Sequence, residues 1–157
     1  MKISAFADTC LRILMRLAAA PDTRATSESL AQAIDVPYNH VSKAVLDLRR
    51  RGFVDATRGR NGGVMIAPAG LRASVGALAR DLDPDLDPVT CIRADGTACP
   101  LIAGCRLRSA LHTAREAFYR TLDPLVVADL VPEAQSGACD SAGPTPLPFP
   151  EVPDPRR

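Results

Sequence analysis

The chain of 157 residues contains no uninterrupted apolar run of about 18 residues, the length that a membrane-spanning helix needs. Its first residues also lack the apolar core and the cleavage pattern of a signal peptide. We therefore expect a cytoplasmic protein with no membrane partner, organised as one compact domain with an appended tail. The formal net charge is only +1, so any affinity for nucleic acid must come from locally clustered charge.

The five cysteines include no closely spaced pair of the kind that structural zinc sites use. In a cytoplasmic protein they are better interpreted as thiols or metal ligands than as disulfides. Cys91, Cys99 and Cys105 follow one another in a stretch that glycine and proline interrupt, so we expect a loop there. Three thiolates without a fourth nearby suit an iron–sulfur cluster, which can accept an unusual fourth ligand. Cys10 is interpreted as a core residue and Cys139 as uninvolved.

Three helices are expected in the first third of the chain, over residues 4–20, 28–34 and 37–51, because apolar side chains recur there at helical spacing. Only a tight turn separates the second helix from the third, which predicts a helix-turn-helix whose second helix enters the DNA major groove. A solvated helix face would show the same polarity, so this helix alone does not decide the function. Its outward side chains could read base edges or bind phosphate: Tyr38, Asn39, His40 and Lys43.

A basic β-hairpin is predicted directly after these helices, with strands over residues 53–57 and 64–67. Its connection, residues 58–63, is rich in glycine and arginine, which permits close approach to DNA and contact with phosphate. Residues 37–66 hold six Lys or Arg against two Asp, a local charge of +4. We therefore predict a winged helix-turn-helix that binds double-stranded operator DNA. The basic and hairpin residues expected to contact DNA are Arg50, Arg58, Arg60 and Asn61.

The fold class predicted for the whole chain is mainly α, with residues 1–80 as the winged DNA-binding domain. Another helix is expected over residues 71–82, and residues 81–106 form an acidic connector and the cysteine loop. A long helix over residues 101–122, within a dimerisation region of residues 101–131, has an apolar seam that favours a two-fold dimer. The alternative is that this seam packs against the winged domain. Residues 132–157, with seven prolines, are expected to be disordered. The seam residues are Leu107, Leu111, Ala114, Phe118 and Leu122.

Several of these segments together resemble the NsrR-type repressors of the Rrf-two group of winged-helix regulators. The resemblance is carried by residues 6–18 of the first helix, by residues 30–33, by the wing at 58–63 and by Cys105-Arg-Leu. It implies a homodimer that represses genes for nitric-oxide detoxification. It also implies a 4Fe–4S cluster, with 2Fe–2S as the alternative, whose nitrosylation releases operator DNA.

The resemblance assigns the cluster ligands to Cys91, Cys99 and Cys105, with Asp8 of the partner subunit as the fourth. From the residues alone, Asp8 is an exposed acid in the first turn of a helix, paired with Arg12, and only the resemblance changes that interpretation. The gap between the first two cysteines is longer than in many members. A related group of cluster-biogenesis regulators has a histidine three residues after the third cysteine, where this chain has Arg108, which argues against that group.

Two other classes of protein remain as alternatives. A dehydratase-like enzyme also uses three cysteines with an open iron site, but no substrate domain is left once the winged domain and the long helix are assigned. We therefore predict that the chain is not an enzyme. A regulator of the same family that senses redox or iron–sulfur status, or a zinc-structured DNA-binding protein, would share the winged helix and the thiols without responding to nitric oxide.

Overall fold

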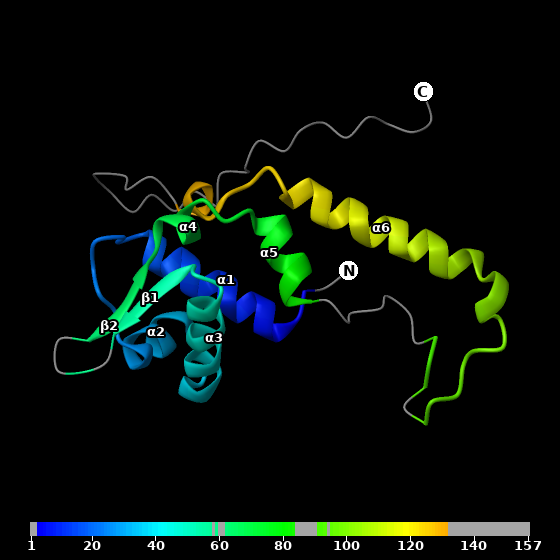
Figure 1. The fold of residues 1–157 in the computed structure, drawn as a ribbon, viewed down its shortest axis with the longest axis horizontal. Helices are drawn as coiled ribbons and strands as arrows, with labels where there is room; N and C mark the ends of the chain where they lie inside the picture. The colour runs from blue at the N-terminus through cyan, green and yellow to red at the C-terminus, as the bar shows by residue number, and fades with distance from the viewer. Residues whose placement is uncertain (1–2, 58, 60–61, 84–90, 94, 132–157) are drawn as a thin grey trace, which may run out of the picture.

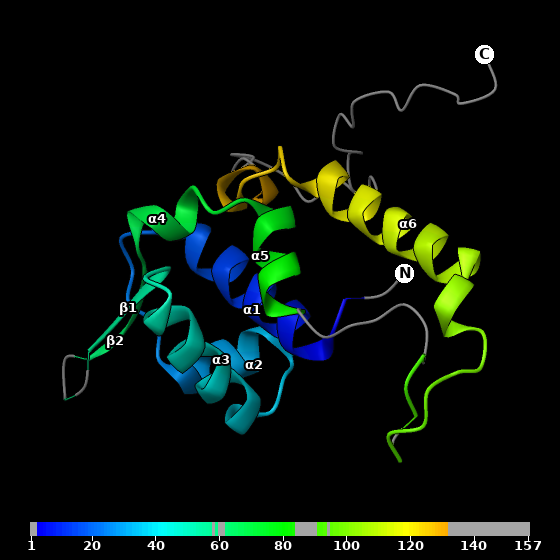
Figure 2. The same ribbon diagram turned by 45° about the vertical axis from the view of Figure 1, so that its right-hand side comes forward.

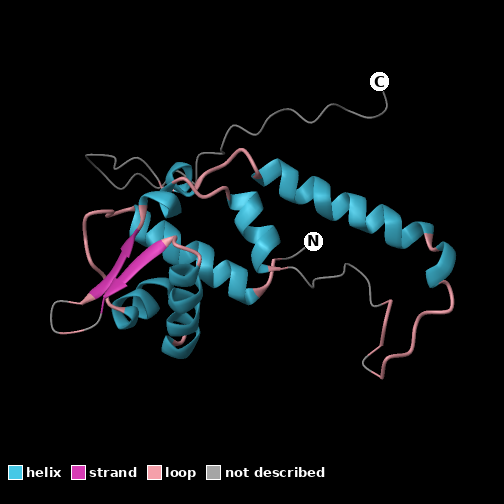
Figure 3. Ribbon diagram, viewed as in Figure 1, coloured by secondary structure: helices cyan, strands magenta, loops and turns pink. Residues whose placement is uncertain are grey.

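The computed structural model describes residues 3–57, 59, 62–83, 91–93 and 95–131. The predicted tail and the wing residues Arg58, Arg60 and Asn61 lie outside the described residues, as does Cys139. Helices make up most of the structure and two strands form a hairpin, which confirms the mainly α fold (Figure 3). The elements run in the order α1 (Ala5–Ala18), α2 (Ser27–Ile34), α3 (Tyr38–Arg50), β1 (Val54–Thr57), β2 (Gly63–Ile66), α4 (Pro68–Leu71), α5 (Val75–Leu82), a 3-10 turn (Ile102–Gly104), α6 (Arg106–Leu122) and a last 3-10 turn (Val127–Leu130) (Figure 1).

Helix α1 passes through the centre of the winged domain, in contact with α2, α3, α5 and β2. Ser4 begins it as predicted, because the Ser4 hydroxyl accepts a hydrogen bond of 3.0 Å from the backbone N–H of Ala7. Cys10 is fully buried, as expected, and this burial raises the pKa of its thiol to about 12. The buried residues of α1 are Ala7, Thr9, Cys10, Ile13, Leu14 and Leu17.

Helices α2 and α3 form the predicted helix-turn-helix. Thr26 and Ser29 cap the start of α2 reciprocally, and Asp35 ends it with a left-handed φ of 51°. Pro37 was expected within the third helix but lies one residue before it, where its carbonyl accepts the N–H of Val41 and it contributes no N–H of its own. Gly52, with a φ of 76°, follows the C-cap residue Arg51 and ends the helix as predicted.

Strands β1 and β2 pair in antiparallel register from Val54 opposite Ile66 to Thr57 opposite Gly63, as the wing prediction required. The hairpin is joined to the chain before α2 by paired hydrogen bonds between Ala25 and Val64, of 3.0 Å and 2.7 Å. Because this link holds the loop end of the hairpin beside the start of α2, the wing and the recognition helix face the same side of the domain (Figure 1).

Two predicted helices depart most from their predicted bounds. The helix expected over residues 71–82 is split into α4 and α5, because Ser74 adopts an extended conformation, pairs with Val126 and then caps α5 through the N–H of Ala77. The helix expected from residue 101 begins only at Arg106, after the 3-10 turn and an extended Cys105. No helix in the described part of the chain is long and apolar enough to cross a membrane.

Candidate DNA-binding face and cysteine loop

The predicted recognition residues lie on the exposed surface of α3. Tyr38 is 54% exposed, and Asn39, His40, Lys43 and Arg50 are exposed as well. The other face of the helix packs into the core, and this packing orients the polar face outward. The buried residues of that face are Val41, Ala44, Val45 and Leu48.

One exposed stripe runs along α3 at positions 39, 43, 46 and 50, the spacing of successive helical turns. It contains an apolar member that the sequence prediction omitted, Leu46, which is 47% exposed. A solvated apolar side chain between polar neighbours is suited to contact with the methyl group of thymine in the major groove. Lys43 and Arg50, on either side of it, can contact the phosphate backbone.

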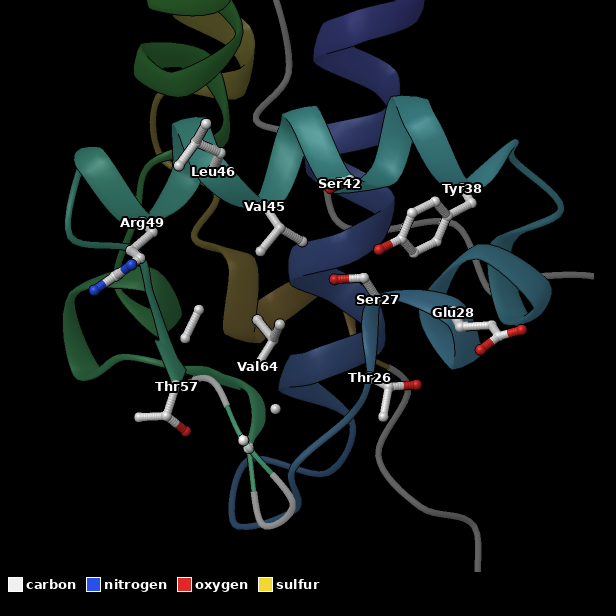
Figure 4. Close-up of a pocket in the computed structure, with 14 residues that line it drawn as sticks. Thr26, Ser27, Glu28, Tyr38, Ser42, Val45, Leu46, Arg49, Thr57 and Val64 are labelled. Atoms are coloured by element: carbon white, nitrogen blue, oxygen red, sulfur yellow. The ribbon is translucent and has the colours of Figure 1, made fainter.

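A cleft of about 750 Å³ separates α3 from the hairpin, with the start of α2 as its third wall (Figure 4). Tyr38, Ser42 and Arg49 border it from α3, and Thr57 from β1. Thr26, Ser27 and Glu28 border it from the start of α2, where the hydroxyl of Thr26 accepts the backbone N–H of Ser29 at 3.0 Å. The guanidinium of Arg49 and the hydroxyls of Tyr38 and Ser42 could contact phosphate in the space between the two elements that a winged helix places against DNA, and the carboxylate of Glu28 lines the same space.

Arginines on this face differ in their partners. Arg24 donates a hydrogen bond of 2.8 Å from Nη1 to Oγ1 of Thr57, at the loop end of the hairpin. Arg51 forms ion pairs with Asp47, at 2.6 Å, and with Asp81, so its charge faces the protein body. Arg49 lines the cleft instead. The sequence prediction chose Arg50 from three consecutive arginines and missed Arg49, because only the helix register places it beside the wing.

The cysteine loop contains a small hairpin. Ile92 pairs with Ala98, and the N–H of Cys99 donates to the carbonyl of Cys91 at 2.8 Å. Cys91 and Cys99 are therefore opposite each other in antiparallel register, where side chains lie on the same face of the ribbon. The turn is closed by Thr97, whose N–H donates at 2.9 Å to Asp95 and lowers the pKa of that carboxyl.

Cys105 lies apart from this hairpin, as the residue that precedes α6. Its Sγ accepts the backbone N–H of Arg108 at 3.4 Å. Among the described residues, no group of three or more His, Cys, Asp or Glu side chains is close enough to hold a metal ion. The geometry thus pairs two of the predicted ligands and leaves the third at the adjoining helix.

Asp8 lies in the first turn of α1, half-exposed, and its Oδ2 is 2.9 Å from Nε of Arg12. This is the ion pair expected from the residues alone. The start of α1 and the cysteine loop are separate segments in both ribbon views (Figures 1 and 2). Among the described residues, Asp8 and the three cysteines of one chain form no group that could hold a metal ion.

The start of α1 is nevertheless linked to the segment that leads into the loop. The backbone N–H of Ser4 donates at 3.0 Å to Oδ2 of Asp83, the residue after α5. Asp83 is only 3% exposed, and its Oδ1 has no hydrogen-bond partner among the described residues. The buried carboxylate thus ties the helix that carries Asp8 to the start of the connector.

Comparison with known proteins identifies the family. The family model of Rrf2, described as an iron-dependent transcriptional regulator, matches residues 3–133. The chain is 46% identical over 134 residues to the HTH-type transcriptional repressor NsrR of Streptomyces coelicolor, covering 83% of this chain and 88% of that protein. It is 36% identical over 137 residues to the HTH-type transcriptional regulator NsrR of Geobacillus kaustophilus, covering 87% and 93%.

Solved structures support the same fold. IscR of T. potens matches with a TM-score of 0.60 and 19% identity, over 83% of this chain and 85% of that one. CymR, the global cysteine regulator of B. subtilis, matches with a TM-score of 0.59 and 24% identity, over 83% and 95%. The relatives regulate transcription and are not enzymes, as predicted for this chain. Because the family model and relatives above 30% identity span most of its length, the chain belongs to the Rrf2 family of DNA-binding transcriptional regulators.

Proposed function

We propose that this protein is a homodimeric repressor that holds an iron–sulfur cluster, releases operator DNA when nitric oxide nitrosylates that cluster, and thereby derepresses genes for nitric-oxide detoxification. The observation that carries the proposal is the loop with three thiols, Cys91, Cys99 and Cys105, in a chain whose curated relatives are named NsrR. The proposed parts are a DNA-binding domain (1–80), a connector and cluster loop (81–106), a dimerisation region (101–131) and a disordered tail (132–157).

The donor set fits an iron–sulfur cluster better than a closed zinc site. Three thiols lie within the loop and its adjoining helix, and the remaining described cysteine, Cys10, is sealed in the core with a raised thiol pKa of about 12. One chain thus supplies three sulfur ligands, and the fourth is proposed to be Asp8 of the partner subunit. When bound, a 4Fe–4S cluster, or the 2Fe–2S alternative, supplies iron that reacts with nitric oxide at the carboxylate-ligated corner.

The residues around this site connect it to the DNA-binding face. Asp83 binds the N–H of Ser4 at the start of α1, and Asp81 pairs with Arg51 at the end of α3. Both acids lie at the start of the connector that leads to Cys91. A change in the position of the loop would therefore act on the helix that carries Asp8 and on the recognition helix. A hundredfold change in operator affinity requires only about 2.7 kcal/mol of coupling between the two sites.

Dimerisation supplies the geometry that operator recognition needs. Two recognition helices about 34 Å apart bind successive major grooves of a pseudo-palindromic site. The winged domain covers the apolar seam of α6 only in part, since Leu107 is 63% exposed and Ala114 is exposed, while Leu111, Phe118 and Leu122 are partly buried. The alternative, that the seam packs on its own winged domain, is therefore not adopted.

The test is anaerobic purification followed by measurement of iron, sulfide and zinc per chain. We expect brown protein with about four irons and four sulfides, the content of one 4Fe–4S cluster. Colourless protein with stoichiometric zinc would support the zinc-structured alternative. Operator duplexes selected from a random-sequence pool then report binding before and after addition of nitric oxide.

Matched variants separate the cluster from general thiol effects. Cys99→Ser is expected to lose iron and the response to nitric oxide, whereas Cys139→Ser, which removes a thiol outside the proposed ligand set, keeps both. If metal-free Cys99→Ser binds the operator as tightly as the parent protein and the parent ignores the gas, the proposed function is wrong.

A further inference from the structure

The junction between α5 and α6 centres on one arginine. Arg80 extends from α5 to α6, where its Nε is 3.4 Å from Oε2 of Glu116 and its Nη2 is 3.2 Å from Oδ2 of Asp123. Its guanidinium also lies over the ring of Tyr119, 5.1 Å from the ring centroid. One planar cation thus contacts three side chains on one face of α6, a geometry that a lysine cannot reproduce.

Close backbone packing accompanies this contact. A Cβ added to Gly76 would lie 2.3 Å from the carbonyl oxygen of Tyr119 and 2.4 Å from Oδ1 of Asp123. The hydroxyl of Ser74 donates at 2.9 Å to the carbonyl oxygen of Asp123. These contacts hold the C-terminal end of α6 against the first turn of α5, and Arg80 holds it against the second turn of α5.

The face of α6 that contacts α5 is distinct from its apolar seam. Successive residues turn by about 100° around an α-helix, which places Glu116, Tyr119 and Asp123 roughly a third of a turn away from Leu111 and Phe118. In Figures 1 and 2 the opposite end of α6 extends away from the winged domain. The contact with α5 thus leaves the part of the seam at Leu107 and Ala114 exposed, where a second copy could pack, while it orients the winged domain relative to that seam.

We propose that Arg80 is a positioning residue that fixes the angle between each winged domain and the dimer helix, and thereby the separation of the two recognition helices. This inference rests on the proposed dimer. Simultaneous binding of two half-sites adds affinity only when the two recognition helices of the dimer lie at the same spacing as the two half-sites. Arg80 therefore acts on recognition of the paired half-sites without touching DNA.

The test compares Arg80→Gln with Arg120→Gln, which removes the same charge from an exposed position of α6 that forms no ion pair with any described residue. Three duplexes are titrated: the selected operator, a single half-site, and an operator with two base pairs inserted between half-sites. We expect Arg80→Gln to bind the operator about tenfold more weakly and the half-site within about twofold of the parent. It should also lose discrimination against the inserted duplex, and Arg80→Lys should recover part of it.

Sedimentation reports whether each variant is a dimer, and thermal unfolding reports whether it is folded, so loss of positioning can be told apart from loss of the dimer or of the fold. Equal losses on the operator and the half-site, or no loss on either, would overturn the role of Arg80. If Arg80→Gln does not fold, Glu116→Gln is used instead, because it removes one of the two ion pairs. It should also weaken operator binding more than half-site binding, by a smaller factor. A parent protein that sediments as a monomer and shows no preference for paired half-sites would instead refute the dimer.

Discussion

Helices α1 and α6 are similar in length, with 14 and 17 residues, but they differ in what covers them. Six residues of α1 are buried by other elements of the same chain, whereas Tyr119 is the one buried residue of α6. Both helices carry apolar side chains at helical spacing, so periodicity alone does not distinguish them. The difference indicates that α1 organises the winged domain, and it supports the proposed packing of α6 against a second copy of the chain.

The largest effect is expected from removing core volume in α1. Leu14→Ala should lower the free energy of unfolding by about 3 kcal/mol, because it leaves a cavity around a side chain that is fully buried. Urea unfolding followed by circular dichroism measures this change. The neighbouring Met15→Ala, at an exposed position, is the control and should change stability by less than about 0.5 kcal/mol. Equal effects of the two substitutions would contradict the central position of α1.

A charge in the seam of α6 should separate assembly from folding. Leu107→Glu is expected to raise the dimer dissociation constant by about a hundredfold, close to 2.7 kcal/mol, because two seams would bring unpaired carboxylates into an apolar contact. The unfolding midpoint of the winged domain should remain unchanged, since Leu107 is 63% exposed. Sedimentation equilibrium measures the first quantity. Ser109→Glu, at an exposed position on the other side of α6, should leave the dimer intact.

The arginines at the end of α3 allow the DNA-binding face to be tested. Arg49→Ala should weaken binding to all duplexes by about 5–10-fold and lower the salt slope by about one, as expected for loss of a phosphate contact. Arg51→Ala, which removes a charge already paired with Asp47 and Asp81, should leave that slope unchanged. Fluorescence anisotropy at several salt concentrations measures both. A lowered slope for Arg51→Ala alone would place the DNA on the other side of the helix.

The smallest effect concerns the thiol buried in α1. Burial raises the pKa of Cys10 from 9.0 to about 12, so the folded state keeps a proton that the unfolded chain loses. Stability from this group is present below pH 9 and should fall as the pH rises toward 12, by about 1 kcal/mol between pH 9 and 10. Urea unfolding at these pH values measures it. In Cys10→Ala the free energy of unfolding should fall less steeply between pH 9 and 10 than in the parent protein, whatever the stability of the variant at pH 7.

Much of the winged domain could be predicted from local signals. The caps at Ser4 and Thr26, the turn at Asp35 and the glycine-rich hairpin each specify their own backbone conformation. The break between α4 and α5 could not be predicted in this way, because Ser74 leaves the helix in order to pair with Val126, about fifty residues further along the chain. Arg49 was missed for a similar reason, since its position depends on where the hairpin lies.

The sequence by itself determined the class of fold, the basic recognition face and the presence of three thiols in one loop, because each depends on residues that are close along the chain. Only the tertiary structure decided that Arg51 faces the protein while Arg49 faces the cleft, that Asp83 is buried against Ser4, and that Arg80 joins α5 to α6. These contacts join residues that are distant in sequence, and their partners are known only once the helices have packed.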